Sequence, residues 1–385
     1  MPKFIEKEIL AETDNNVVLF RPHIPKNSIE LVSQVLNSRW IGQGPKVDQF
    51  ENEFNEKFGS NSTKSLSTNS GTSALHLAYM AAGIKSGDTI LCPALTCTAT
   101  NIPLLYMGAN IKWVDTDKNS MNISIEHLAS LVDQNVKAIV IVHYGGIPVD
   151  LEKIKKIADP FGITIIQDAA HALGAKVNGT PIIDFGDYTV HSFQAIKHIT
   201  TGDGGMLSLR NNSELVKYVE RLRWFGIDRR DKQKGTWEND ITEIGYKYQM
   251  TDISAALGLA GLQEFEEVKS VREKLYNRYV QNLKNNEKIS VLNPELTNPK
   301  LESSYWLFTI EVKKDRDNLI NLLRSNGIES GLVHYRNDNY KIFEKFKSDL
   351  PNLDFIESRY LSLPLHTHMT LSDVNRICDV VNSDW

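Results

Sequence analysis

Two segments of the chain carry residue types that could bind and activate a small molecule. One is residues 167–171 (Gln-Asp-Ala-Ala-His), directly after an apolar run, and the other surrounds Lys197. A lysine held beside apolar walls or other cations loses pKa and becomes an amine nucleophile. The carboxylate of Asp168 in the same crevice could pair with a protonated ring nitrogen. Each residue also has an ordinary explanation, because most lysines are solvated and Asp168 could simply cap a helix.

Small and hydroxyl-bearing residues form a second kind of candidate site, one suited to an anion. Gly71, Thr72 and Ser73 follow an apolar run and open a predicted helix. Glycine lets an anion approach the backbone, and the two hydroxyls add donors at the positive end of the helix. Ser192, five residues before Lys197, suits the same ligand. A plain helix cap explains the first three residues equally well.

A polar segment at residues 245–252 precedes a long helical pattern. Thr251 or Asp252 is the expected N-cap of that helix. Lys247 comes just before this cap, and we expect it to protrude from its domain toward a partner subunit.

The elements that must position these residues alternate between strands and helices. Apolar, β-branched runs predict buried strands, and the alternation predicts right-handed βαβ units and a mainly parallel sheet. A glycine turn at residues 202–205 joins the last two runs and predicts an antiparallel edge. The predicted strands are 64–68, 89–93, 111–115, 138–143, 164–167, 189–192 and 206–209, and the helices between them include 72–82, 125–132 and 150–160.

The carboxyl-terminal part of the chain has a different pattern. A helical stretch over 254–283 is followed by a predicted strand over 305–312, a helix over 316–326 and a second strand over 329–334. This pattern predicts a smaller α+β domain. We expect a large domain over residues 15–262 and a small domain over 263–385, with residues 1–30 able to pack on either.

Length and composition narrow the class of protein. A chain of 385 residues exceeds the length at which a single core stops growing, which favours two domains. A net charge of −5 and 41% hydrophobic residues are typical of a soluble globule and give no basic field for nucleic acid. The charged amino terminus and the lack of long apolar runs predict neither a signal peptide nor a membrane span. Three cysteines are too few for a disulfide framework, which favours the cytoplasm.

Cysteine spacing also bears on metal binding. Cys92 and Cys97 have no second pair of ligands nearby in the sequence. A structural metal site usually needs four protein ligands. We therefore expect no metal site.

Taken together, the motifs resemble the DegT/StrS-type nucleotide-sugar aminotransferases over nearly the whole chain, from about Arg21 to His368. The resemblance implies an α/β fold, fold type I of the pyridoxal-phosphate (PLP) enzymes, also called the aspartate-aminotransferase fold. In that fold a mainly parallel seven-stranded sheet is flanked by helices, and a smaller carboxyl-terminal α+β domain follows. The segments that carry the resemblance are 21–22, 40–45, 50–51, 71–72, 93–100, 168–171, 192–197, 248–251 and 361–366.

The resemblance implies a role for each matching residue. Lys197 is the lysine that forms a Schiff base with PLP and then carries protons during amino transfer. Asp168 pairs with the pyridine nitrogen, and His171 lies near the phenolic oxygen of the cofactor. The phosphate is bound by Gly71, Thr72, Ser73 and Ser192.

Two positions depart from the family pattern. Cys97 stands where many relatives have an aromatic residue that stacks on the cofactor, and a thiol offers less contact area. Lys247 stands where many relatives have an asparagine that reaches the cofactor phosphate of the neighbouring subunit. A lysine there would bring a positive charge to that phosphate or to the substrate's diphosphate, or would be solvated. The first role requires a homodimer with shared active sites.

The activity that the resemblance implies is transfer of an amino group, usually from L-glutamate, to a keto group of a nucleotide-activated deoxysugar. PLP becomes pyridoxamine phosphate between the two halves of that reaction. The product would serve a cell-surface polysaccharide, such as an O-antigen, or a glycoconjugate. The residues expected from family position to contact the sugar nucleotide are Trp40, Gly42, Arg229, His334, Tyr335 and His366, although Arg229 and Arg230 could equally be a solvated pair.

Three other functions fit parts of this pattern. A sugar dehydratase of the same family has a histidine in place of the lysine, so Lys197 argues against it. A non-catalytic PLP-binding regulator would not need both Lys197 and Asp168. A Rossmann-type dehydrogenase would need a Gly-x-Gly-x-x-Gly motif after the first strand, and that motif is absent from the sequence.

Overall fold

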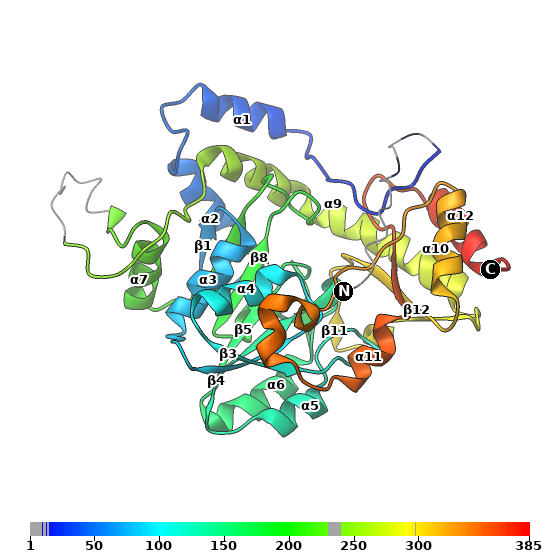
Figure 1. Cartoon of the computed structure of the whole chain (residues 1–385). Coiled ribbons are helices and arrows are strands. Elements are labelled where there is room, and N and C mark those ends of the chain that lie inside the picture. The colour runs from blue at the N-terminus through cyan, green and yellow to red at the C-terminus, as the bar shows by residue number, and fades with distance from the viewer. Residues whose placement is uncertain (1–9, 11–12, 14, 230–239, 297) are drawn as a thin grey trace.

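A seven-stranded sheet forms the centre of the computed structural model, which describes residues 10, 13, 15–229, 240–296 and 298–385 (Figure 1). Its strands are β1 (Thr63–Thr68), β2 (Thr89–Pro93), β3 (Asn110–Val114), β4 (Val136–Val142), β5 (Thr164–Asp168), β8 (Tyr188–Ser192) and β9 (Gly205–Arg210). The strand order is β1-β9-β8-β5-β4-β2-β3, and only β9 runs against the others. The predicted seven-stranded, mainly parallel sheet is confirmed. The prediction that the antiparallel strand lies at the edge of the sheet is wrong. The strand β9 lies inside the sheet, because β1 pairs with it along its whole length.

The sheet is buried on both faces, which explains the continuous apolar character of its strands. Ala138 and Val140 of β4 pack in a cluster with residues of α3 and α4, whereas Ile139 and Ile141 pack with residues of α5 and α6. The helices around the sheet are α1 (Ser28–Leu36), α2 (Pro45–Phe58), α3 (Gly71–Ala81), α4 (Thr98–Tyr106), α5 (Ile125–Leu131), α6 (Leu151–Ala158) and α7 (Ser213–Arg223).

A second, smaller sheet lies toward the carboxyl terminus, at the far end of the long helix α9 (Asp252–Leu283) (Figure 1). It contains the antiparallel strands β10 (Ile289–Val291), β12 (Phe308–Val312) and β13 (Tyr360–Leu363). The helices of this part are α10 (Arg316–Ser325), α11 (Pro351–Glu357) and α12 (Leu371–Asn382), and a third small sheet joins β11 (Leu301–Glu302), β6 (Lys176–Val177) and β7 (Thr180–Pro181). The expected boundary after residue 262 falls inside the unbroken α9, and its position stays a prediction. In the described ranges no helix has both the length and the apolar character needed to cross a membrane.

One strand prediction in the small sheet is wrong, and another is confirmed with a later start. Residues 329–334 make only one isolated bridge, from Gly331 to Ser362, before Arg336 bridges to Leu95 of the large sheet region. The chain leaves the small sheet here, and Tyr360–Leu363 supplies the missing strand. The strand predicted over 305–312 begins only at Phe308, because Tyr305 has a left-handed φ of 57° that interrupts an extended chain.

Asp252 ties together the starts of two helices. Thr251 is the N-cap of α9, one of the two choices predicted. The Asp252 carboxylate instead accepts hydrogen bonds from the start of α2. The N–H groups of Gly44 (2.7 Å) and Val47 (3.1 Å) donate to its Oδ1, and that of Lys46 donates to its Oδ2 (3.1 Å). One side chain therefore satisfies amides that a helix start leaves without partners.

Replacing Asp252 with alanine should lower the free energy of unfolding by about 1–3 kcal/mol, because the buried amides at the start of α2 lose their acceptor. Urea denaturation of both proteins measures the difference. Asp379, which is exposed on α12, is the matched control, and Asp379→Ala should change the free energy by less than about 0.5 kcal/mol. Equal losses in the two variants would contradict this role for Asp252.

Candidate active site

The carboxyl ends of the parallel strands bring the predicted residues to one edge of the large sheet. Because β1, β2, β5 and β8 run in the same direction, the segments that follow them emerge side by side. This edge is where open α/β sheets place ligands. The residues delivered there are Gly71, Thr72 and Ser73 after β1, Cys97 after β2, Asp168 and His171 at the end of β5, and Ser192 and Lys197 at the end of β8.

Asp168, the last residue of β5, is a buried carboxylate held by two donors. Thr100 Oγ1 donates to its Oδ2 at 2.7 Å, and the N–H of Ala170 donates to its Oδ1 at 3.0 Å. Burial raises the pKa of Asp168, while these two hydrogen bonds and the charge of Lys197 act in the opposite direction. Among the described residues no cation forms an ion pair with it. A carboxylate fixed in this way suits a cationic ring nitrogen brought by a ligand.

Lys197 lies partly buried in the turn after β8. Its Nζ is 3.7 Å from the centroid of the Trp306 ring. Burial lowers the pKa of Lys197 to about 7, with Asp168 and Cys97 opposing the shift and Arg272 adding to it. A large share of the amine is therefore uncharged near neutral pH, which is the form that attacks a carbonyl carbon.

Two histidines face the same space. The His171 ring stacks on Trp306, with centroids 3.7 Å apart and planes 19° apart, and the His334 ring lies 5.5 Å from His171. Burial is the main cause that lowers the pKa of both, that of His334 to about 3, so both rings are neutral at pH 7. Tyr144 and Tyr360 fix the backbone beside His334 by donating to the carbonyls of Val333 and His334. The His334 Nε2 is buried and has no hydrogen-bond partner among the described residues.

Glycines let the start of α3 approach the end of β8 and the start of β9. A Cβ on Gly205 would lie 2.5 Å from the Ser70 carbonyl oxygen and 2.7 Å from the Gly71 nitrogen. A Cβ on Gly71 would lie 3.0 Å from the Cβ of Ser192. Because of this close approach, the positive end of α3 and the Ser192 hydroxyl lie together, an arrangement suited to an anion.

The side chains at the start of α3 are partly engaged within the turn itself. Ser70 is the N-cap, and its Oγ accepts from the N–H of Ser73 at 3.0 Å. The Ser73 hydroxyl donates to Asn69 Oδ1 at 2.7 Å. Ser73 therefore shapes the turn. The Thr72 side chain forms no hydrogen bond with any described residue, and the amides of Gly71 and Thr72 begin the helix.

Lys247 lies beside this turn, but its amine points away from it. The Asn69 side chain donates to the Lys247 carbonyl at 3.1 Å. The Lys247 ammonium lies 5.2 Å from the centroid of the Phe225 ring. With the Gln249 amide turned so that its oxygen faces donors, that oxygen accepts from Lys247 Nζ at 2.9 Å. Lys247 is exposed, and the described contacts of its amine are with Phe225 and Gln249.

Of the residues expected to contact a sugar nucleotide, only His334 lies against His171 and Lys197. Tyr335 is 43% exposed and Trp40 36% exposed, and the carbonyl of Gly42 accepts from the N–H of Asp252 at 2.7 Å. His366 is buried, and its Nε2 lies 3.1 Å from the Val18 carbonyl oxygen. Their contact with a substrate stays a prediction.

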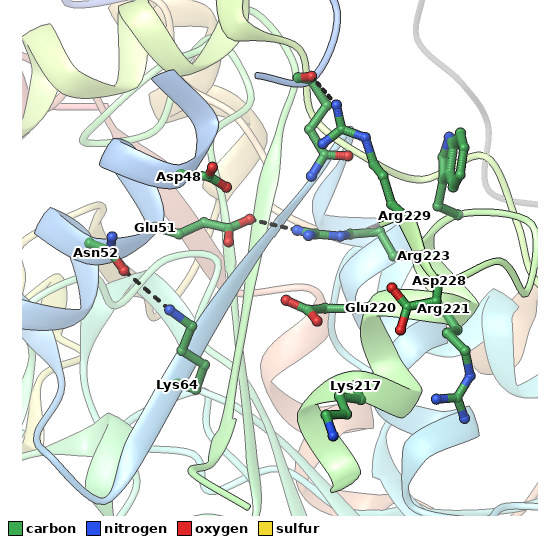
Figure 2. Close-up of a pocket in the computed structure, with 12 residues that line it drawn as sticks. Asp48, Glu51, Asn52, Lys64, Lys217, Glu220, Arg221, Arg223, Asp228 and Arg229 are labelled. Atoms are coloured by element: carbon green, nitrogen blue, oxygen red, sulfur yellow. Dashed lines mark hydrogen bonds and ion pairs between the residues drawn. The ribbon is translucent and has the colours of Figure 1, made fainter. Parts of the chain in front are cut away.

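Arg229 lies in a separate crevice of about 400 Å³ between α2 and α7 (Figure 2). There Glu51 and Arg223 form a buried ion pair at 2.5 Å, and Arg229 donates to the Gln43 carbonyl. None of the residues that line this crevice is Lys197, Asp168 or His171. Arg230 lies outside the described residues.

Sequence reasoning missed two residues of the site. Thr100 lies one helical turn after Cys97 in α4, and its spacing gave a signal, because both side chains then face the same edge. No sequence signal pointed to Trp306, because this residue lies inside a predicted strand. Among the described residues no group of three or more histidine, cysteine, aspartate or glutamate side chains could hold a metal ion.

The comparison with known families decides which family this chain belongs to. The model of the DegT/DnrJ/EryC1/StrS aminotransferase family matches residues 22–382. The chain belongs to this family. Enzymes of the DegT family use PLP, and the lysine, the buried carboxylate and the helix start at one sheet edge are a donor set that fits this cofactor.

Individual members agree with this assignment over almost the whole chain. "Uncharacterized protein MJ1066" of Methanocaldococcus jannaschii is 36% identical over 380 residues, which cover 94% of this chain and 95% of that protein. The structure of AtS13 from Actinomadura melliaura has a TM-score of 0.90 at 32% identity and covers 97% of this chain and 100% of its own. The sugar aminotransferase CalS13 from Micromonospora echinospora has a TM-score of 0.89 at 28% identity, covering 96% and 100%. A putative sugar aminotransferase of Streptococcus pneumoniae, Spr1654, is similar in both its PLP and PMP (pyridoxamine phosphate) forms, with a TM-score of 0.88 at 27% identity, covering 95% and 98%.

The lowered pKa of Lys197 gives a direct prediction. Below about pH 7 the amine is protonated and unreactive, and above it the neutral amine reacts with an acylating reagent. Labelling of the full chain without added PLP, followed by peptide mass spectrometry, should show a midpoint near pH 7 for Lys197. Lys274, exposed on α9, is the control for access of the reagent to a surface amine. A midpoint for Lys197 near the ordinary lysine value of about 10.4 would show that the predicted shift is wrong.

Proposed function

We propose that this PLP-dependent sugar aminotransferase moves an amino group from L-glutamate to a keto group, at C3 or C4, of a nucleotide-activated deoxysugar. The observation that carries the proposal is the placement of an amine with a pKa of about 7, Lys197, at the same sheet edge as the buried carboxylate of Asp168. Membership of the family and similarity to CalS13 support a sugar as the acceptor. The product would enter a cell-surface polysaccharide or glycoconjugate, and we propose that the reaction takes place in the cytoplasm.

Each residue at the sheet edge has a proposed task toward PLP. PLP supplies an electron sink for the carbon that loses or gains the amino group. Asp168, held by Thr100, would keep the pyridine nitrogen protonated, and Lys197 Nζ would move the proton at the reacting carbon. The neutral ring of His171 would lie by the phenolic oxygen, and Cys97 would contact the cofactor ring. The phosphate would be held by Gly71, Thr72, Ser73 and Ser192.

We propose that two chains share their active sites. Lys247 is exposed, and its ammonium faces Phe225 and Gln249 rather than Lys197 of its own chain. A cation there could reach the phosphate or diphosphate bound by a second copy. Large apolar side chains are also exposed on and after α1, including Ile29 (84%) and Ile41 (50%). A partner subunit would remove this apolar surface from water.

Lys197→Ala should abolish both steps of the proposed reaction. The PLP-loaded protein should show the visible absorbance of PLP joined to a lysine amine, and addition of L-glutamate should convert it to the absorbance of pyridoxamine phosphate. The variant should show neither, because no other described amine replaces Lys197 at this edge. Lys274→Ala, on the surface of α9, should behave as the parent protein. An unchanged spectrum in Lys197→Ala would remove Lys197 from its proposed role.

Sharing of sites predicts complementation between two defective variants. Lys197→Ala and Lys247→Ala homodimers should each have little activity. A mixture refolded or co-expressed at equal ratio should recover about a quarter of the parent activity, because half the dimers are mixed and each has one intact site of two. If Lys247 serves its own chain, the mixture should gain nothing over the separate variants.

A further inference from the structure

A buried cation lies behind the proposed active site without a carboxylate partner. Arg272, in the middle of α9, is 3% exposed, and no ion pair joins it to any acidic residue in the described ranges. Its Nη1 donates to the carbonyls of Leu365 (2.8 Å) and Trp306 (3.2 Å), and its Nε is buried without a hydrogen-bond partner among the described residues. Burying an unpaired guanidinium is costly, so such a residue points to a role beyond packing.

The segment that Arg272 holds, residues 303–307, is anchored at several points. The Ser304 N–H donates to the Gly146 carbonyl and that of Trp306 to the Gly145 carbonyl, both at 3.0 Å. The Ser304 hydroxyl donates to the carbonyl of His171 at 2.8 Å. The bond from Arg272 to the Trp306 carbonyl adds to these, so the backbone of Trp306 is fixed between the large sheet and α9.

The side chain of Trp306 links this fixed backbone to Lys197. The indole N–H donates to the carbonyl of Ile196, the residue before Lys197, at 3.1 Å. The ring is 1% exposed, stacks on His171, and lies 3.7 Å from Lys197 Nζ. Phe20 also stacks on it, with centroids 5.5 Å apart. The indole therefore contacts the reacting amine and orients the backbone that carries it.

The titratable groups around the Lys197 amine come from four other parts of the fold. Asp168 and His171 belong to β5 and the turn after it, Cys97 precedes α4, His334 lies in the segment after α10, and Arg272 lies on α9. The two histidines are neutral at pH 7. Arg272 is thus the permanent cation of this group, and Trp306 offers the face on which an ammonium is stabilised.

We propose that Arg272 and Trp306 form a positioning pair for Lys197, in which the guanidinium fixes Trp306 and the indole ring holds the amine at the sheet edge. This inference rests on the proposed function, because that function makes Lys197 the reacting amine. Its test does not depend on amino transfer. The two members act on the amine with opposite sign. The Arg272 charge disfavours protonation of Lys197, whereas the π face of Trp306 favours the protonated form.

Because the two residues shift the pKa of Lys197 in opposite directions, an experiment can separate their positioning role from a general entry of water into the site. The pH midpoint of Lys197 acylation is measured by peptide mass spectrometry in the full chain, and the pH midpoint of the visible absorbance is measured after loading with PLP. Arg272→Gln should raise the acylation midpoint, because a like charge is removed. Trp306→Leu should lower it, because the cation–π contact is lost. The absorbance midpoints should move in the same directions.

Two controls match these variants. Arg272→Lys keeps the charge and should leave the acylation midpoint close to that of the parent protein. Arg316 also donates from Nη1 to two carbonyls, those of Glu357 (2.6 Å) and Tyr360 (3.2 Å), but it lies in the small sheet region. Its Nε is buried and has no hydrogen-bond partner in the part of the chain that the structure describes. Arg316→Gln should not move the midpoint.

The outcomes decide the proposal even if one variant fails to fold, since Arg272→Gln and Trp306→Leu test it separately. If the acylation midpoint rises toward the ordinary lysine pKa in both variants, the proposal is overturned, because entry of water alone explains that result. An unmoved midpoint in the folded Arg272→Gln variant, or an equal shift in Arg316→Gln, would also overturn it. Acylation requires no sugar substrate, so failure of the proposed amino transfer leaves this test intact.

Discussion

The cost of removing charge from water is the constraint on which this structure depends. Asp168, Lys197 and Arg272 carry groups that are expensive to bury, and they lie around one edge of the large sheet. Each is compensated differently: Asp168 by the Thr100 hydroxyl and the Ala170 amide, Arg272 by two backbone carbonyls, and Lys197 by the face of Trp306 and a lowered pKa. The parallel strands make this arrangement possible, because they end together and present their following segments to the same space.

Much of the large sheet could be predicted from the sequence, because its strands are buried on both faces and their apolar runs are nearly continuous. The same pattern placed Asp168 and Lys197 at strand ends, and the glycines of residues 202–205 correctly signalled an antiparallel strand. The position of that strand inside the sheet, between β1 and β8, was not predictable, since nothing local in residues 63–68 shows that they pair with β9 along their full length.

The parts that escaped prediction depend on contacts between distant segments. His334 reaches the site because the chain leaves the small sheet after Gly331 and is fixed by hydroxyls of Tyr144 and Tyr360. Trp306 lay inside a predicted strand, whereas the left-handed Tyr305 and the bonds to Gly145, Arg272 and Ile196 set its direction toward Lys197. A periodic pattern carries no information on such contacts, which arise from tertiary structure.

We propose above all that this sheet edge transfers an amino group to a sugar. The most direct measurement is incubation of the PLP-loaded protein with ¹⁵N-labelled L-glutamate and a panel of keto-deoxysugar nucleotides, followed by mass spectrometry of the sugar nucleotides. We predict that at least one of them gains a single ¹⁵N atom in place of its keto oxygen. Conversion of glutamate without label in any sugar nucleotide of the panel, or loss of a hydroxyl group from the sugar instead of amination, would contradict the account.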